Sequence, residues 1–223
     1  MNRLYELYKY GGIREVYRGV CDFIMYDIVG AGESPYHERR NDNEIRWRII
    51  RENLDDEFRT LLDVGCADGY LTAKAGEYGL KATGIDIDES RIDYAKDKWG
   101  AIDTVSFLND QITPETIQDL PTTDVCLFLT VHHHWVSEFG YDDSIDMFDI
   151  LLQKNEIVFY EPPGDRQLPS AETSHDPADS IGHYTDLIEN EFGDDVEIEA
   201  VEMVPYGPTR RSDPFFTLNA RNY

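Results

Sequence analysis

The sequence predicts an open α/β sheet, mostly parallel, with helices on both faces and an antiparallel hairpin strand near the C-terminus. Between residues 61 and 160, short apolar runs alternate with longer amphipathic stretches, which is typical of a parallel sheet covered by helices. The first apolar run ends in the glycine-containing turn of LLDVGCADGYL, which opens a helix. Two further strand-like runs flank the turn-rich segment PYGPTRRSD, which indicates a hairpin.

The apolar runs LLDV, KATGIDI, VSFL, DVCLFLTV and EIVFY are expected to form buried strands, over residues 61–64, 81–87, 105–108, 124–131 and 156–160. The intervening helices are expected over 71–78, 89–99 and 144–152, and the hairpin strands over 196–203 and 214–220. Upstream, residues 42–58 are predicted to form a helix with Asn41 as its N-cap. Residues 4–28 have apolar side chains at helical spacing, which Gly11 and Gly12 divide into two helices, and residues 162–180 are expected to form a long polar loop.

A chain of 223 residues suits one domain with an extension, so we expect a helical extension or cap over 1–41 and a main domain over 42–223. Its three cysteines are too few and too scattered for a disulfide framework or a cysteine-based zinc site. No run of about eighteen apolar residues occurs, and the N-terminus lacks the apolar core of a secretory signal. We therefore expect a cytoplasmic protein without a transmembrane segment.

The formal net charge is −25, and the carboxylates are spread along the whole chain. A uniformly acidic surface remains soluble where salt screens its self-repulsion, so the charge predicts a halophilic host. The same charge disfavours nucleic acid as a partner, because binding to a phosphate backbone needs clustered Lys and Arg.

The turn in LLDVGCADGYL connects a predicted strand, which reaches Asp63, to a helix that begins after Gly69. Gly65 can adopt backbone angles that other residues avoid, which lets the chain turn sharply beneath a ligand. A helix N-terminus also offers free N–H donors, and such turns at the carboxyl ends of strands bind nucleotides in open α/β sheets.

This turn resembles the glycine-rich first motif of the class I S-adenosylmethionine-dependent methyltransferases, whose fold is Rossmann-like. The resemblance implies that S-adenosylmethionine is the cofactor and that the turn contacts it through Asp63, Gly65, Cys66, Ala67 and Gly69. Ala67 stands where the family has a middle glycine, which is a small departure. The G-x-G-x-x-G pattern of nicotinamide enzymes is absent, because Cys66-Ala67-Asp68 follows Gly65.

The next two strand ends complete the predicted adenosine site. In GIDID, Asp86 stands about twenty residues after the glycine turn, where a carboxylate can accept hydrogen bonds from both ribose hydroxyls. The resemblance implies this role for Asp86 and places Ile87 against the adenine. In FLNDQI, it implies that Asp110 accepts from the adenine amino group and that its neighbour Gln111 helps to position the ring. Asn-Asp pairs are also typical of plain turns, so this assignment has a structural alternative.

The fourth strand leads into HHHW, and the resemblance implies that residues 130–135 line the reaction site. Thr130 is expected to contact the cofactor. His133 and His134 match a histidine pair of small-molecule members, whereas His132 stands where an apolar residue is common. We regard His132 and His133 as candidates to take a proton from a hydroxyl or amine acceptor, with structural packing as the alternative. Adjacent side chains point apart, which disfavours a metal, and no metal is expected.

A cluster of arginines within thirteen residues bears on the acceptor. If several face the site, they would favour an acceptor with carboxylate or phosphate groups. The alternative is a set of surface ion pairs with neighbouring acids, and the arginines of the hairpin turn have the same two interpretations. The residues are Arg39, Arg40, Arg46, Arg48 and Arg51, their neighbours Glu38, Asp42, Glu44 and Glu52, and the turn residues Arg210 and Arg211.

The predicted function is methyl transfer from S-adenosylmethionine to O or N of a small or glycan-type acceptor, by a monomer or homodimer. Residues 1–30 suit a cap over the acceptor, a dimer contact or a peripheral membrane contact, and we favour the cap. One alternative is an RNA methyltransferase with a continuous positive groove, and another is a catalytically silent adenosine-binding scaffold of the same fold. A nicotinamide-dependent oxidoreductase is disfavoured by the glycine spacing.

Overall fold

The structure, a computed structural model, describes residues 42–162, 179–205 and 212–221. The described helices are α3 (Asn43–Glu52), α4 (Tyr70–Tyr78), α5 (Glu89–Trp99), α6 (His132–Phe139), α7 (Tyr141–Gln153) and α8 (Ser180–Phe192). The strands are β1 (Thr60–Val64), β2 (Lys81–Asp86), β3 (Val105–Asn109), β4 (Thr123–Leu129), β5 (Asn155–Glu161), β6 (Glu197–Pro205) and β7 (Ser212–Asn219). Among these residues, no helix is long and apolar enough to cross a bilayer.

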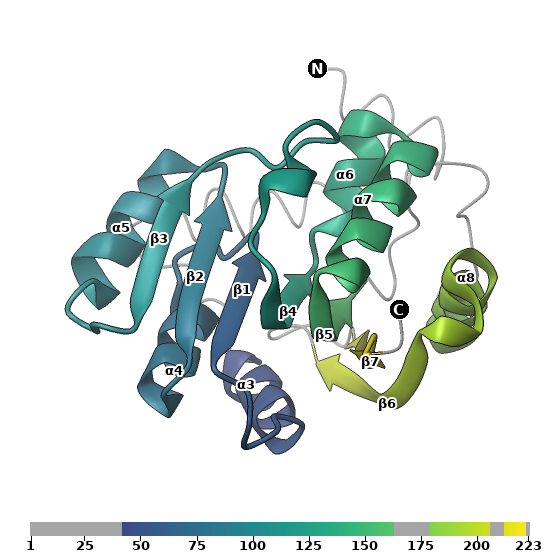
Figure 1. The fold of residues 1–223 in the computed structure, drawn as a ribbon, viewed down its shortest axis with the longest axis horizontal. Coiled ribbons are helices and arrows are strands. Elements are labelled where there is room, and N and C mark those ends of the chain that lie inside the picture. Colours follow the sequence, from purple (N-terminus) through teal and green to yellow (C-terminus); the bar gives the residue numbers. More distant parts are fainter. Residues whose placement is uncertain (1–41, 163–178, 206–211, 222–223) are drawn as a thin grey trace, which may run out of the picture. The chain divides into compact units, whose positions relative to one another are not determined.

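The strands form one sheet in the order β3-β2-β1-β4-β5-β7-β6 (Figure 1). Strands β1 to β5 pair in parallel, whereas β7 is antiparallel to both β5 and β6. The predicted mostly parallel sheet with an antiparallel C-terminal hairpin is therefore confirmed. Strand order reverses between β1 and β4, and open α/β sheets bind ligands beyond the strand ends at such a switch point.

Helices cover both faces of the sheet, as expected. One face packs against α3, α4 and α5, and the other against α6, α7 and α8. Strand β4 shows why both faces need cover: Val125 and Leu127 belong to one core and Cys126 and Phe128 to the other, and all four are fully buried. A central strand buried on both sides is a continuous apolar run, which is the pattern that predicted it.

Several element bounds differ from the prediction. Helix α3 ends at Glu52 rather than at residue 58, because Asn53 caps it and donates its side-chain amide to the Ile49 carbonyl at 2.8 Å. Strand β4 stops at Leu129, since Thr130 has a positive φ of 57°. Helices α6 and α8 were not predicted. The predicted helices over 4–28 and most of the loop over 162–180 lie outside the described residues.

Candidate functional site

The glycine-rich turn has the close contacts that its sequence suggested. Gly65 has a φ of +73°, and a Cβ at this position would lie 2.4 Å from the Val131 Cγ2 atom. Gly69 has a φ of +75°, and its Cβ would lie 2.4 Å from the Phe107 ring. Ala67, the residue in place of the family's middle glycine, also adopts a left-handed conformation with a φ of +50°. The turn therefore has a backbone shape that glycine favours at all three positions.

Asp63 is a buried carboxylate at the foot of this turn. It is 4% exposed, and its Oδ2 atom accepts a hydrogen bond from the Thr72 hydroxyl of α4 at 2.6 Å. Burial raises the pKa of Asp63 from 3.8 to about 7, and the nearby carboxylates Asp86 and Asp68 raise it further against the Thr72 hydrogen bond. Three acidic side chains in a dry site are stabilised by a cationic ligand, so their chemistry fits the sulfonium and amino groups of S-adenosylmethionine.

Asp86 joins the end of β2 to the glycine-rich turn. Its Oδ2 atom accepts from the Ala67 backbone N–H at 2.8 Å, and its Oδ1 atom accepts from the Asp88 N–H at 2.9 Å. The carbonyl of Ile85 accepts from the backbone N–H groups of Gly65 and Cys66 at 2.8 and 3.0 Å. The predicted cofactor residues of the first two strand ends are therefore in direct contact with one another. The Cys66 side chain is 7% exposed and packs with Ile92, which leaves only its backbone for the predicted cofactor contact.

The other predicted adenosine contacts lie at the exposed ends of β2 and β3. Ile87 is 64% exposed, so its apolar side chain is accessible to a ligand. Its carbonyl accepts from the Asn109 side-chain amide at 2.9 Å. Asp110 and Gln111 are also exposed, and the Asp110 carboxylate accepts from the Gln111 backbone N–H at 2.8 Å. The structure thus brings an exposed apolar surface and an exposed carboxylate to neighbouring strand ends.

The end of β4 is a strained turn. Thr130 is β-branched and has a φ of +57°, a conformation that costs such residues free energy and is concentrated at functional sites. Its N–H donates to the Glu161 carbonyl of β5 at 2.6 Å. The next residue, Val131, packs against Gly65, so this turn contacts the glycine-rich turn of β1.

The three histidines that follow differ in their surroundings. His132 is fully buried, contacts the Tyr160 hydroxyl through Nδ1 at 2.7 Å, and has its pKa lowered to about 3 by burial. A neutral, enclosed imidazole cannot reach a substrate, so the geometry does not support the predicted base role for His132. His133 is partly buried and His134 is exposed, and their rings lie 4.0 Å apart. In the described part of the chain, no group of three His, Cys, Asp or Glu side chains could hold a metal ion.

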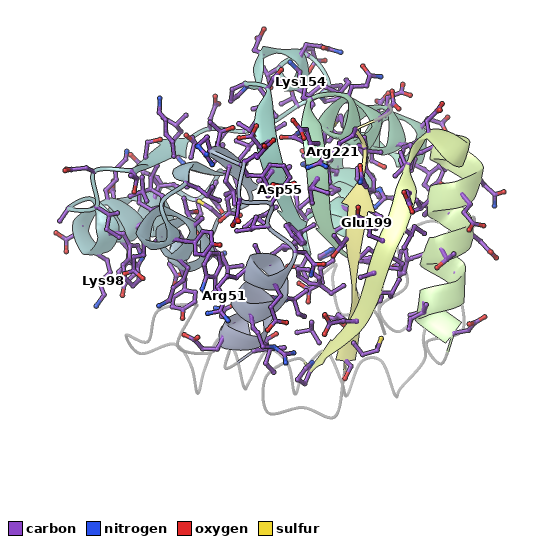
Figure 2. All side chains as sticks on the ribbon, turned by 60° about the horizontal axis from the view of Figure 1, so that its bottom comes forward. Arg51, Asp55, Lys98, Lys154, Glu199 and Arg221 are labelled. Atoms are coloured by element: carbon purple, nitrogen blue, oxygen red, sulfur yellow. The ribbon has the colours of Figure 1, made fainter. Side chains whose placement is uncertain are left out.

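In the part of the chain that the structure covers, the arginines of the cluster do not converge on one point: Arg46 reaches the carboxyl end of β5, whereas Arg48 and Arg51 lie on the surface. Arg46 is 3% exposed and forms a buried ion pair with the fully buried Glu161, with Asp42 at 3.5 Å as a second partner. Arg48 pairs with Glu202 of β6 at 3.7 Å on the surface, and Arg51 is exposed on α3 (Figure 2). Surface pairing was predicted as the alternative, but for Arg46 the pairing is internal. Arg39, Arg40, Arg210 and Arg211 lie outside the described residues.

Two residues of this region, Thr72 and Glu161, were missed by sequence reasoning, and Val131 was expected only as part of the range 130–135. Thr72 holds Asp63, Val131 packs on Gly65, and Glu161 accepts from Thr130 while it pairs with Arg46. Thr72 acts through a hydrogen bond to Asp63 and Val131 through packing on Gly65, and neither contact leaves a pattern in the sequence. Glu161 did leave one, since a charged residue directly ends the apolar run of β5 at the carboxyl edge of the sheet.

Comparisons with known proteins agree with this geometry. A family model described as "Methyltransferase domain" matches residues 62–153. A ubiquinone biosynthesis O-methyltransferase from Pelagibacter ubique is 30% identical over 131 residues, which is 53% of this chain and 52% of the relative. One from Coxiella burnetii is 37% identical over 54 residues, or 24% of this chain and 23% of the relative. The chain therefore spans about half or less of the length of these curated relatives.

Solved structures share the fold. The methyltransferase WbdD, a bifunctional kinase-methyltransferase, superposes with a TM-score of 0.64 at 19% identity, over 88% of this chain and 42% of that chain. The magnesium protoporphyrin IX methyltransferase of Synechocystis PCC 6803, solved with bound S-adenosylmethionine, gives a TM-score of 0.53 at 17% identity, over 80% of this chain and 76% of that chain. Strand order, the glycine-rich turn and the family match over residues 62–153 together support a class I S-adenosylmethionine-dependent methyltransferase.

Proposed function

We propose that this protein transfers a methyl group from S-adenosylmethionine to an oxygen atom of a small-molecule acceptor. The observation that carries the proposal is the contact between the glycine-rich turn and Asp86, which the Ala67 N–H makes at 2.8 Å. It assembles the residues of two strand ends into one site at the switch point of a methyltransferase fold. The name of the Pelagibacter relative supports oxygen as the methylated atom.

The cofactor would be held at the carboxyl edge of β1, β2, β3 and β4. Asp86 would accept from the ribose hydroxyls, Ile87 would cover one face of the adenine, and Asp110 with Gln111 would bind its edge. Gly65, Ala67 and Gly69 would allow the turn to approach the ligand closely, and Asp63 and Thr130 would line its amino-acid end. When bound, S-adenosylmethionine supplies a sulfonium-activated methyl group, and alignment of the two reactants accounts for most of the acceleration.

His133 is the better of the two histidine candidates for proton removal from an acceptor hydroxyl. It lies in the first turn of α6, directly after the end of β4, and it is partly exposed, whereas His132 is enclosed. An imidazole ring can take up a proton from a hydroxyl group in a catalysed step, which suits a general base. His134, whose ring lies 4.0 Å from that of His133, would orient it or contact the acceptor.

The acceptor class is proposed from the ion pairs that Arg46 and Arg48 form with carboxylates in the described residues. Arg46 and Arg48 are both paired with carboxylates, so they do not support an acidic acceptor or a continuous positive groove for RNA. A neutral hydroxylated small molecule, such as a phenol, therefore ranks ahead of an acidic glycan and of RNA. The role of residues 1–41 as a cap stays a prediction, as does the monomeric or dimeric state.

Calorimetric titration with S-adenosylmethionine, S-adenosylhomocysteine and NADH, in molar KCl, tests the cofactor assignment first. We expect micromolar binding of the first two and none of NADH. Asp86→Asn keeps the size of the side chain, removes its charge and replaces one of its two acceptor oxygens with a donor. It should weaken S-adenosylmethionine binding at least tenfold in a protein that still folds. Binding of neither adenosyl ligand by folded wild type would exclude S-adenosylmethionine as the cofactor and with it the proposed function.

A methyl-transfer assay with isotope-labelled cofactor then tests the acceptor class. Catechols and other phenols, hydroxylated sugars with and without a carboxylate, and RNA are offered separately, and labelled products are identified by mass. We expect label on phenolic oxygen, and turnover in His133→Gln reduced about a hundredfold with cofactor binding unchanged. Label on RNA, with affinity that falls steeply with salt, would reverse the ranking of acceptors.

A further inference from the structure

A chain of hydrogen bonds runs through the core from β5 to the junction of α6 and α7. The Tyr160 hydroxyl lies 2.7 Å from His132 Nδ1, and His132 Nε2 lies 3.5 Å from Ser144 Oγ. The Ser144 hydroxyl donates to the Tyr141 carbonyl at 2.6 Å. Tyr160, His132 and Ser144 are all fully buried.

These contacts fix the direction of every hydrogen bond in the chain. Because Ser144 gives its only hydroxyl hydrogen to the Tyr141 carbonyl, its oxygen can only accept from His132. His132 therefore carries its proton on Nε2, and Nδ1 must accept from the Tyr160 hydroxyl. The imidazole is neutral, since burial among Phe128, Phe148 and Tyr160 disfavours its charged form and lowers its pKa.

His132 is also the first residue of α6, directly after the strained turn at Thr130 and Val131. This turn is attached to β5 on both sides. The Thr130 N–H donates to the Glu161 carbonyl at 2.6 Å, and the His132 side chain accepts from the neighbouring Tyr160. No side chain caps α6 at its N-terminus, and the His132 side chain provides a tertiary anchor for its first turn, beside the packing of Trp135 on Phe128.

The anchored turn touches the predicted cofactor site. Val131 stands between Thr130 and His132, and its Cγ2 atom occupies the space beside Gly65, where even a Cβ would be only 2.4 Å away. A shift of α6 by a fraction of an ångström would therefore move Val131 relative to the glycine-rich turn. A backbone as strained as that of Thr130 persists only where its surroundings hold it in place.

We propose that His132 is a positioning residue of the cofactor site: with Tyr160 and Ser144 it holds the strained β4–α6 turn so that Val131 packs on Gly65. This inference rests on the proposed function, because it assumes that the glycine-rich turn binds S-adenosylmethionine. It also replaces the base role for His132 with one that needs no contact with the acceptor. His132 then acts on affinity for the cofactor through the turn, and not on the proton of the substrate.

The test is a mutant cycle read out by cofactor affinity in folded protein. His132→Phe and Tyr160→Phe each break the chain and leave one buried polar partner unsatisfied, whereas the double variant removes both partners from an otherwise apolar cluster. His132→Asn keeps an acceptor near the position of Nδ1 and is the conservative variant. Tyr184→Phe is the matched control, since it removes a buried hydroxyl from the same core and from a ring that lies edge-on to Tyr160, while the hydrogen-bond partners of His132 are Tyr160 and Ser144.

Each variant is first shown to be folded by circular dichroism, and S-adenosylmethionine is then titrated calorimetrically under one set of conditions. We expect His132→Phe to weaken binding about tenfold, His132→Asn to restore most of the affinity, and Tyr184→Phe to bind like wild type. An NMR contact between the Val131 methyl group and the Gly65 Hα should be present in wild type and weakened in His132→Phe. A single imidazole form with Nε2 protonated should appear in ¹⁵N spectra.

The outcomes separate two failures. If wild type does not bind S-adenosylmethionine, the proposed function fails, whatever the variants do. If wild type binds and folded His132→Phe has an affinity within twofold of it, His132 is a packing residue only and the inference is overturned. If His132→Phe does not fold, Tyr160→Phe takes its place in the test, because it keeps the ring and removes only the hydroxyl. We expect the same tenfold loss of affinity, and an affinity within twofold of wild type would overturn the inference.

Discussion

Asp63→Asn should make the protein more stable and worse at binding its cofactor, and the stability gain should grow with pH. Asp63 is 4% exposed, and burial raises its pKa from 3.8 to about 7. Between these two pH values the folded protein keeps a proton that the unfolded chain has lost. Unfolding then releases a proton, so stability falls as pH rises from about 4 to about 7 and is level above.

The size of this loss follows from the shift. At about 1.4 kcal/mol for each pH unit, ionisation of Asp63 costs the folded state at most about 4 kcal/mol above pH 7. Roughly 3 kcal/mol of this falls between pH 5 and pH 8. The amide introduced by Asp63→Asn has no charge to bury, and its carbonyl oxygen can still accept the hydrogen bond that Thr72 now donates at 2.6 Å. A cationic ligand would gain less from the neutral amide, so affinity for S-adenosylmethionine should fall at pH 8.

The assay is denaturant unfolding of both proteins at pH 5 and pH 8 in the same salt, with calorimetric titration at pH 8. Other carboxylates titrate in both proteins, so the difference in free energy of unfolding isolates Asp63. Asp124, at the opposite end of the sheet, is the control. Burial would raise its pKa, but hydrogen bonds from Arg59 and Thr60 outweigh burial and lower it.

Asp124→Asn should therefore lower stability at pH 8 and leave cofactor binding unchanged. Asp63→Asn, in contrast, should raise stability at pH 8 and weaken cofactor binding. The reasoning is refuted if the difference in free energy of unfolding between Asp63→Asn and wild type is the same at pH 5 and pH 8. Such a result would mean that ionisation of the buried Asp63 carboxylate does not destabilise the folded protein.

Further predictions concern the turn, the buried ion pair and the net charge. Ala67→Gly should remove the strain of the left-handed conformation and raise the free energy of unfolding in urea by about 1 kcal/mol, without loss of cofactor affinity. A lower free energy of unfolding would contradict this prediction. Gly65→Ala should cost at least about 1–2 kcal/mol and abolish S-adenosylmethionine binding, because the new methyl group meets Val131; calorimetry decides this. Arg46→Met should cost about 3–5 kcal/mol in denaturant unfolding, whereas a double variant that also replaces Glu161 with Met should recover most of it. With a net charge of −25, the thermal midpoint should rise on going from low salt to molar KCl, and a midpoint that does not move would remove the reason to infer a halophilic host.

The sequence predicted the sheet well because its central strands are buried on both faces. The run from Val125 to Phe128 must be apolar at every position, and such runs are visible without knowledge of their partners. The same pattern could not show where β4 ends, because Thr130 and Val131 continue the run of strand-forming residues. What stops the strand is a positive φ at Thr130, and this depends on contacts with β5 and the glycine-rich turn.

In the candidate site too, the sequence predicted the residues with local signals but not those whose roles depend on distant partners. Asp63, Gly65 and Asp86 are local features, each placed at a strand end, and the structure brings them together as the spacing required. The histidine run is different, because consecutive side chains on a helix face in different directions and the chain alone does not say which one faces the core. His132 was predicted as a base with packing as the alternative, and Tyr160 and Ser144, which favour the alternative, lie 28 and 12 residues away in the sequence. A polar residue within an apolar pattern therefore raises two hypotheses, chemistry or a buried hydrogen-bond network, and only its distant partners distinguish them.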